Sequence, residues 1–117
     1  MVPIFRNVTD TLKAKIPNVP ILPSIGNNDV MWHYQAPNST YKAEYYSDLY
    51  EIFFENVPAN AAYPKLNEIS DTFHNGGYYR YEITEDLIFL SINSIYFNSE
   101  NEVDFAEAAV EMDWIAN

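Results

Sequence analysis

The sequence predicts a mixed helix-and-strand fold of the α/β class, in which short β-strands are flanked by helices. Apolar residues recur at a helical spacing in some segments and alternate with polar residues in others. These segments follow one another in the order helix, strand, helix, helix, strand, strand, helix, which fits an α/β or α+β arrangement. Apolar residues make up 48% of the 117 residues, which excludes a disordered chain and allows one modest core.

Residues 4–16 are predicted to form the first helix, because Ile4, Val8, Leu12 and Ile16 fall four apart on one stripe. Pro17 ends it. The next apolar run, residues 19–25, is predicted to be a buried strand, although its two prolines would free it from ladder hydrogen bonds at two points. Residues 27–40 have mixed polarity and no period, so we expect a loop.

Residues 41–55 return to a helical spacing. One face of this predicted helix carries Tyr45, Leu49, Ile52 and Phe53. We expect Pro58 to close the segment. A shorter helix is predicted over about residues 64–73, since Pro64 suits a first helical turn and Gly76 and Gly77 suit a C-terminal stop.

Residues 78–83 and 87–92 are predicted to be two strands joined by a tight turn at residues 84–86. The second strand is apolar on both faces, which predicts a central position in a sheet. Residues 98–102 form a predicted polar loop, and residues 103–115 a terminal helix.

Two clusters of side chains have a structural interpretation and a functional one. The tyrosines Tyr41, Tyr45, Tyr46 and Tyr50 could form a sugar or lipid platform, but their helical spacing favours core packing with the hydroxyls at the rim. The acidic residues Glu100, Glu102, Asp104, Glu107 and Glu111 resemble a cation site in composition alone. A solvated acidic helix face is the favoured interpretation.

The charge of the chain restricts its partners. Six basic and seventeen acidic residues give a formal charge of −11, which disfavours nucleic-acid binding. A phosphate-containing substrate would need metal ions or a separate basic segment to offset this charge. The chain has no cysteine, so thiolate metal sites and thiol nucleophiles are excluded.

Targeting signals are sparse in the sequence. No apolar run is long enough to cross a bilayer, and no signal peptide is visible at the N-terminus. Two glycosylation sequons begin at Asn7 and Asn38, and they matter if the parent chain is secreted.

One segment carries side chains that could bind a ligand or take part in catalysis. It is Gly26-Asn27-Asn28-Asp29, which directly follows the predicted strand 19–25. Ligands of α/β folds bind at the carboxyl ends of strands. Amide and carboxylate oxygens suit a hard or borderline divalent cation. The alternative is an Asx-rich turn, in which Asn and Asp bond to their own backbone.

This motif is similar to the Gly-Asn-His-Asp motif of calcineurin-like metallophosphoesterases. Further blocks follow in family order: residues 73–79 resemble the Phe-x-x-Gly-Gly-Tyr-Tyr stretch of acid sphingomyelinase-like members, residues 87–96 the strand "IISLNTxxY", and residues 112–115 the "QLEWL" helix. The resemblance, to the acid sphingomyelinase-like and endopolyphosphatase-like branch, covers about residues 17–115. It implies that residues 1–117 are a central fragment of a single metallophosphoesterase domain, a partial β-sandwich.

The resemblance also implies site residues. Asn27 would bind one metal of a two-metal site, Zn or similar, and Asp29 would orient its neighbours by hydrogen bonding. Asn28 stands where the family has His, and an amide cannot donate a proton at neutral pH. The sequence Asn-Asn-Asp at residues 27–29 resembles the form of the motif in endopolyphosphatase-like members of the family. The implied reaction is metal-dependent hydrolysis of phosphoanhydride or phosphodiester bonds, with polyphosphate favoured over sphingomyelin-like or nucleotide phosphodiesters.

The other metal ligands of the family, Asp-x-His, Gly-Asp, His and Gly-His-x-His, have no counterpart in these 117 residues. We therefore expect the chain alone to be inactive. The resemblance also allows a secreted, lysosomal or vacuolar parent, which this chain does not itself indicate. A non-catalytic acidic interaction domain or a decayed pseudoenzyme fragment is the alternative.

Two histidines complete the candidates. His33 could contact the substrate or act as an acid near neutral pH, or it could lie in a surface loop beside aromatic neighbours. His74 is predicted to cap a helix end.

Overall fold

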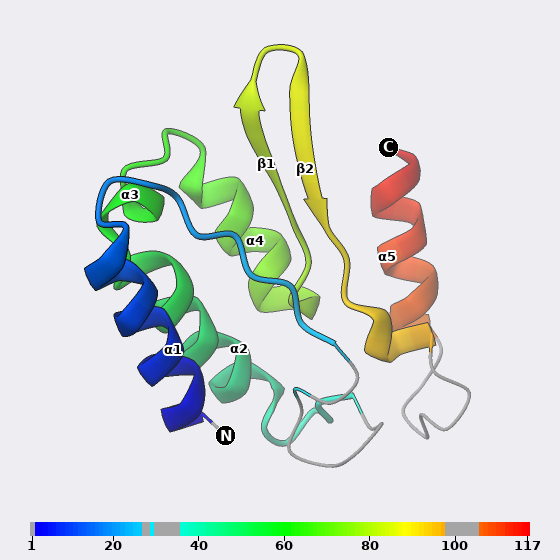
Figure 1. Cartoon of the computed structure of the whole chain (residues 1–117). Helices are drawn as coiled ribbons and strands as arrows, with labels where there is room; N and C mark the ends of the chain where they lie inside the picture. The colour runs from blue at the N-terminus through cyan, green and yellow to red at the C-terminus, as the bar shows by residue number, and fades with distance from the viewer. Residues whose placement is uncertain (1, 27–28, 30–35, 98–105) are drawn as a thin grey trace.

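The computed structural model describes residues 2–26, 29, 36–97 and 106–117. Its elements are helices α1 (Val2–Lys15), α2 (Lys42–Tyr50), α3 (Pro58–Ala61), α4 (Leu66–Gly76) and α5 (Ala106–Ala116), strands β1 (Tyr79–Thr84) and β2 (Leu87–Ser91), a π-helical turn η1 (Glu51–Glu55) and a 3₁₀ turn η2 (Ser94–Phe97). The mixed helix-and-strand class predicted from the sequence is confirmed, and Figure 1 shows the two strands as a hairpin beside the helices.

Helix α1 confirms the first predicted helix, but its apolar stripe is not core. Ile4 and Val8 are 63% and 54% exposed, whereas Thr9 is buried. Polar contacts attach α1 to the turn η1 and the residue after it: Arg6 pairs with Glu51, and Lys13 Nζ lies 3.0 Å from Asn56 Oδ1. The spacing therefore predicted the helix correctly, although the apolar stripe itself is exposed.

The predicted helix 41–55 is present as α2 continued by η1. Pro58 starts the short helix α3 instead of closing a segment, because proline is tolerated in a first helical turn. Helix α4 begins two residues after Pro64 and ends at Gly77, whose φ is +76°. A Cβ at Gly77 would approach Tyr46 to 2.7 Å and Ile25 to 2.9 Å, so this helix end requires glycine.

The sheet consists of β1 and β2, which pair antiparallel with Tyr79 opposite Ser91 and Tyr81 opposite Phe89. Residues 85–86 form the tight turn, within the predicted 84–86. The register shifts between Glu82 and Thr84. Within the described residues β2 pairs with β1 alone, so its predicted central position in a sheet is wrong there.

Residues 19–25 are extended but do not form a strand, which corrects the prediction of a buried strand over these residues. Pro20 and Pro23 have no N–H to donate, and side chains of other elements hold the segment in place of a ladder. The described part of the chain thus shows a two-stranded sheet with helices, and a metallophosphoesterase sandwich is not seen in it.

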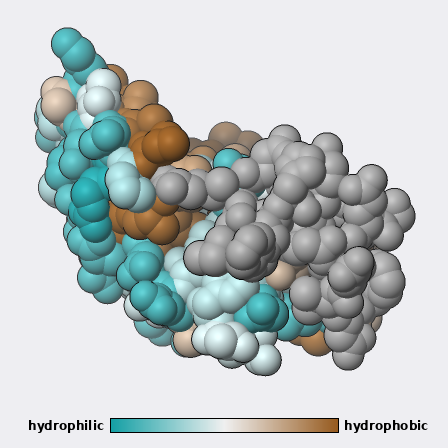
Figure 2. All heavy atoms as spheres, turned by 90° about the horizontal axis from the view of Figure 1, so that it is seen from below, coloured by the Kyte–Doolittle hydropathy of each residue, from teal (hydrophilic) through white to brown (hydrophobic). Residues whose placement is uncertain are grey.

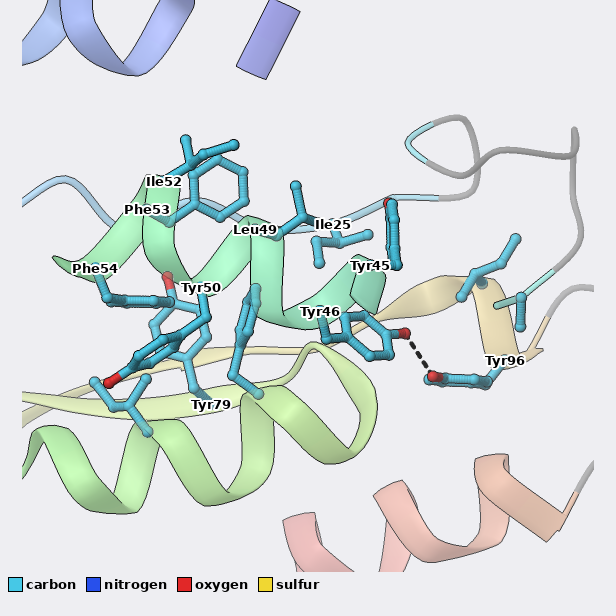
Figure 3. Close-up of a cluster of buried hydrophobic side chains, with 14 residues drawn as sticks. Ile25, Tyr45, Tyr46, Leu49, Tyr50, Ile52, Phe53, Phe54, Tyr79 and Tyr96 are labelled. Carbon is cyan, nitrogen blue, oxygen red and sulfur yellow. Dashed lines mark hydrogen bonds between the residues drawn. The ribbon is translucent and has the colours of Figure 1, made fainter. Parts of the chain in front are cut away.

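Aromatic rings from α2, η1, α4 and β1 form the core (Figure 3). Phe73 of α4 lies near its centre, with ring centroids 5.3 Å from Phe54, 6.0 Å from Tyr46 and 6.1 Å from Tyr79. Tyr45, Tyr46 and Tyr50 are buried and Tyr41 is half-buried. Core packing of these tyrosine rings is therefore confirmed, whereas the Tyr46 hydroxyl is buried and does not lie at the rim as predicted.

Large apolar side chains also remain on the surface, on α1, the hairpin, η2 and α5 and in the segments that follow α1 and β2. They are Ile4, Val8, Leu12, Ile16, Val19, Ile83, Leu87, Ile88, Leu90, Ile92, Phe97, Val110, Met112 and Ile115. In the space-filling view from below, apolar surface is exposed beside a hydrophilic flank (Figure 2). None of the described helices combines the length and apolar character needed to span a membrane.

Candidate functional site

The extended segment that leads to Gly26 is attached to three elements by side-chain hydrogen bonds. Buried Asn60 of α3 accepts the N–H of Ile21 at 2.9 Å and donates to the Ile21 carbonyl at 2.6 Å. Tyr79 of β1 donates its hydroxyl to the Pro23 carbonyl at 2.6 Å, and Ser91 of β2 donates to Ser24 Oγ at 2.9 Å. These contacts replace a strand ladder and fix the path of the chain into the candidate motif.

Gly26 and Asp29, the first and last residues of the motif, are hydrogen-bonded to each other twice. The Gly26 N–H donates to Asp29 Oδ2 at 2.9 Å, and the Asp29 N–H donates to the Gly26 carbonyl at 3.1 Å. The hydroxyl of Tyr45, on α2, donates to the Asp29 carbonyl. Figure 3 shows Tyr45 beside Ile25, close to this end of the segment. The arrangement agrees with both sequence interpretations, an Asx turn and an acidic residue that orients its neighbours.

The other proposed site residues, Asn27, Asn28 and His33, lie outside the described residues. Of the predicted catalytic and metal-binding set, the structure therefore places Asp29 alone. The described residues contain no group of three or more His, Cys, Asp or Glu side chains that could hold a metal ion.

An apolar groove of about 430 Å³ runs between α1 and the extended segment, with Asp29 among its lining residues. Val8 and Leu12 line it from α1, and Leu22 and Ile25 from the segment. The Phe5 and Phe53 rings, 5.9 Å apart, also border it. The predicted stripe of α1 thus faces a groove that meets the candidate motif.

A second polar cluster, which the sequence did not reveal, surrounds Glu111 of α5. The Glu111 side chain is fully buried, and its Oε1 accepts the N–H of Asn93 at 2.7 Å. Asn93 Nδ2 donates to the Gly76 carbonyl at 3.0 Å and to the Tyr46 hydroxyl at 3.1 Å. The Tyr46 and Tyr96 hydroxyls lie 2.5 Å apart, as the dashed line in Figure 3 shows.

Burial controls the ionisation of this cluster. Burial raises the pKa of Glu111 to about 7, and the Asn93 N–H offsets part of that shift. Burial likewise raises the pKa values of the Tyr46 and Tyr96 hydroxyls. Glu111 Oε2 has no hydrogen-bond partner among the described residues. A neutral carboxylic acid is therefore the form of Glu111 that this pocket accepts best.

The prediction of a solvated acidic face is wrong for Glu111, and Glu107 is half-buried and paired with Lys42 at 3.0 Å. Glu100, Glu102 and Asp104 lie outside the described residues. Trp114 could have revealed the error, because it shares a helix face with Glu107 and Glu111 at helical spacing. Its ring packs on Tyr78 with centroids 4.8 Å apart.

His74 lies in the last turn of α4, as its predicted capping role requires. Its Nδ1 is 2.8 Å from the Ser70 carbonyl, and its ring centroid is 4.7 Å from that of Tyr50. Both sequon asparagines are exposed: Asn7 lies within α1 and Asn38 precedes α2. His74 thus belongs to the scaffold.

The sequence was compared with known proteins, and it is similar to a phosphodiesterase. The chain is 31% identical over 115 residues to sphingomyelinase phosphodiesterase C from Dictyostelium discoideum. The match covers 93% of this chain, and the chain spans 23% of the length of that relative. No family model matches the sequence. No solved structure matches it significantly.

Proposed function

We propose that this chain is a segment of a larger phosphodiester hydrolase of the calcineurin-like metallophosphoesterase type. The observation that carries the proposal is the match over 93% of the chain to a relative named as a phosphodiesterase. Because the chain spans 23% of that relative, hydrolysis is assigned to the longer protein and not to these 117 residues.

Residues 26–29 are the part of the phosphoryl site that this segment contributes. Gly26 and Asp29 are hydrogen-bonded to each other, and Tyr45 bonds the Asp29 carbonyl. This arrangement supports Asp29 as a positioning residue. In the proposal Asn27 binds a divalent metal and Asn28 contacts the phosphoryl group.

Divalent metals would supply the activation of water and the neutralisation of phosphoryl oxygens. They would also offset the formal charge of −11, which otherwise repels an anionic substrate. His33 is the residue of this segment suited to proton transfer near neutral pH. The remaining metal ligands belong to polypeptide outside the segment.

The relative's name supports a phosphodiester substrate over the phosphoanhydride bonds of polyphosphate. The one feature that supports polyphosphate is Asn28, which stands where the sphingomyelinase-like pattern has His. The two substrates are therefore compared directly in the test of this proposal.

The test uses the complete protein that carries this segment, assayed with an aryl phosphodiester, sphingomyelin and polyphosphate in the presence and absence of Zn²⁺ or Mn²⁺. We expect metal-dependent turnover of a phosphodiester. Asn27→Ala should lower kcat at least about 100-fold, because a ligand of the reacting metal is lost. Asn67→Ala, at an exposed position on α4, is the matched control and should keep full activity.

Full activity of Asn27→Ala would remove Asn27 from the site. Faster turnover of polyphosphate than of either diester would reassign the substrate class. A folded complete protein that hydrolyses none of the three substrates with either metal would contradict the proposal and favour a non-catalytic interaction domain.

A further inference from the structure

Helix α5 buries a carboxyl group where helices normally bury apolar side chains. Of its residues, all of which the structure describes, Glu111 alone is buried, whereas Val110, Met112 and Ile115 are 38% to 53% exposed. The large aliphatic side chains of α5 therefore contribute little to its docking. Figure 1 shows the helix at the end of the molecule opposite α1, beside η2 and the hairpin.

Polar and aromatic contacts attach α5 to the other elements. Glu111 Oε1 accepts the Asn93 N–H at 2.7 Å, and Lys42 of α2 pairs with Glu107 at 3.0 Å on a partly exposed side of the helix. Trp114 adds a ring contact. Of the α5 side chains in these contacts, Glu111 is the most deeply buried, so the docking of α5 is most sensitive to its charge.

The surroundings of Glu111 suit the neutral acid and not the carboxylate ion. Its Oε2 atom has no hydrogen-bond partner among the described residues. The titratable side chains that face this region are Lys42 and Tyr46 of α2, Tyr78 before β1, Tyr96 of η2 and, on α5 itself, Glu107. Burial raises the pKa values of the three tyrosine hydroxyls, so they remain neutral. The cation among these groups, Lys42, is paired with Glu107.

Ionisation of Glu111 would place a negative charge in this cluster with the Asn93 N–H as its hydrogen-bond donor. A buried carboxylate without a cation is strongly unfavourable, and release of α5 would return it to water. Burial raises the pKa of Glu111 from 4.5 to about 7, so the docked state binds the proton more tightly than the released state. Docking therefore weakens as pH rises from about 4.5 to 7, by up to about 300-fold.

The sequence of α5 supports this view of Glu111. Residues 112–115 correspond to the last four letters of the "QLEWL" motif that they resemble, so Glu111 stands where that motif has Gln. An amide of the same length offers the same acceptor oxygen and cannot ionise. The titratable group is thus a feature of this chain and not of the motif.

We infer that Glu111 makes α5 a pH-sensitive switch, in which the helix is docked while the carboxyl is protonated and is released when the carboxyl is ionised. The inference rests on the buried position of Glu111 and on the few contacts that hold α5. It does not depend on the proposed function.

Hydrogen exchange measured by mass spectrometry at pH 5 and pH 8 tests this inference on the complete protein. Each rate is divided into that of the unfolded peptide at the same pH, which gives a protection factor. We expect the protection factor of residues 107–116 to fall at least about 10-fold from pH 5 to pH 8, since an isolated helix of this length is unstable in water. Residues 69–76 of α4 should remain at least about 100-fold protected at pH 8, because α4 belongs to the aromatic core.

Glu111→Gln should keep α5 docked at both pH values, with a change in protection factor of less than about 3-fold. The amide keeps an acceptor for the Asn93 N–H and has no charge to bury. Asp113→Asn, at an exposed position of the same helix, is the matched control and should show the fall seen in the native protein. Glu107→Gln removes the other carboxyl that faces this region and should also lose protection between pH 5 and pH 8.

Equal protection of residues 107–116 at the two pH values in the native protein would refute the inference, whether or not the variants fold. So would a fall that persists in Glu111→Gln, or one that disappears in Glu107→Gln alone. Complete loss of protection over α4 at pH 8 would show that the whole segment unfolds, and would equally refute the release of α5. None of these outcomes depends on whether the protein hydrolyses a phosphodiester.

Discussion

Glu111 has one carboxylate oxygen bonded to the Asn93 N–H and the other without a hydrogen-bond partner among the described residues. Burial raises its pKa from the ordinary 4.5 to about 7. The folded state therefore holds a proton that the unfolded state releases between these two pH values. Since the native state binds more protons there, stability falls as pH rises from about 4.5 to 7.

We predict that Glu111→Gln abolishes most of this pH dependence. The amide keeps an oxygen for the Asn93 N–H and cannot ionise. At pH 8 the variant should exceed the native chain in free energy of unfolding by up to about 3 kcal/mol, and at pH 4.5 the two should be nearly equal. Urea denaturation at a series of pH values measures the difference.

Glu44→Gln, at an exposed position on α2, is the control for the general effect of removing one negative charge from an acidic chain. If it flattened the pH profile as strongly as Glu111→Gln, the dependence would belong to net charge and not to the buried carboxyl.

Single residues show where sequence reasoning reached its limit at the candidate site. The Asx-turn interpretation of Asp29 could be reached from the sequence because a turn carries its own local signal, and its bond to Gly26 lies within four residues. Glu111 was missed because its partner Asn93 is 18 residues away. Burial of an acidic residue depends on which distant groups meet it, and the helical spacing of Glu111 and Trp114 indicates a shared face without identifying those groups.

The side chain of Asn60 holds the extended segment that leads to the candidate motif. It is 1% exposed and bonds both the N–H and the carbonyl of Ile21, and its Nδ2 also donates to the Phe53 carbonyl at 2.7 Å. Asn60→Ala should lower the free energy of unfolding by about 3 kcal/mol, because buried backbone groups lose their partners. Thermal or urea denaturation of the chain measures this change.

The control for this prediction is Asn67→Ala, which removes the same side chain from an exposed helical position and should cost less than about 0.5 kcal/mol. Equal stability of Asn60→Ala and the native chain would show that the segment is held by other contacts. Asn60→Asp adds a finer comparison, because it keeps an acceptor for the Ile21 N–H and loses both donated bonds.

Helices were the elements best predicted from the sequence. The spacing of apolar residues indicated α1 and α2, and Gly77 supplied the stop of α4 that its φ of +76° requires. Residues 19–25 were misassigned because their apolar character indicates burial but not a ladder partner. Whether such a segment pairs depends on donors that Pro20 and Pro23 lack and on side chains 39 to 67 residues away.

For the molecule as a unit, we predict that the isolated 117-residue chain does not hydrolyse an aryl phosphodiester in the presence of Zn²⁺ or Mn²⁺. The proposed reaction needs a set of ligands for two metals. The chain has two histidines, and one of them, His74, is already hydrogen-bonded to the Ser70 carbonyl within α4. Product release above a buffer blank, lost on addition of a chelator, would contradict this prediction. The complete protein, assayed under the same conditions, is the positive control.

The fastening of residues 21–24 by Asn60, Tyr79 and Ser91 has a consequence for the order of folding. These contacts join residues 39, 56 and 67 positions apart, whereas helices and the hairpin close over short loops. Long loops cost more entropy to close, and distant contacts form slowly. In a refolding experiment we therefore expect α4 and the hairpin to gain protection first, and the residues beside the candidate motif to be locked in place last.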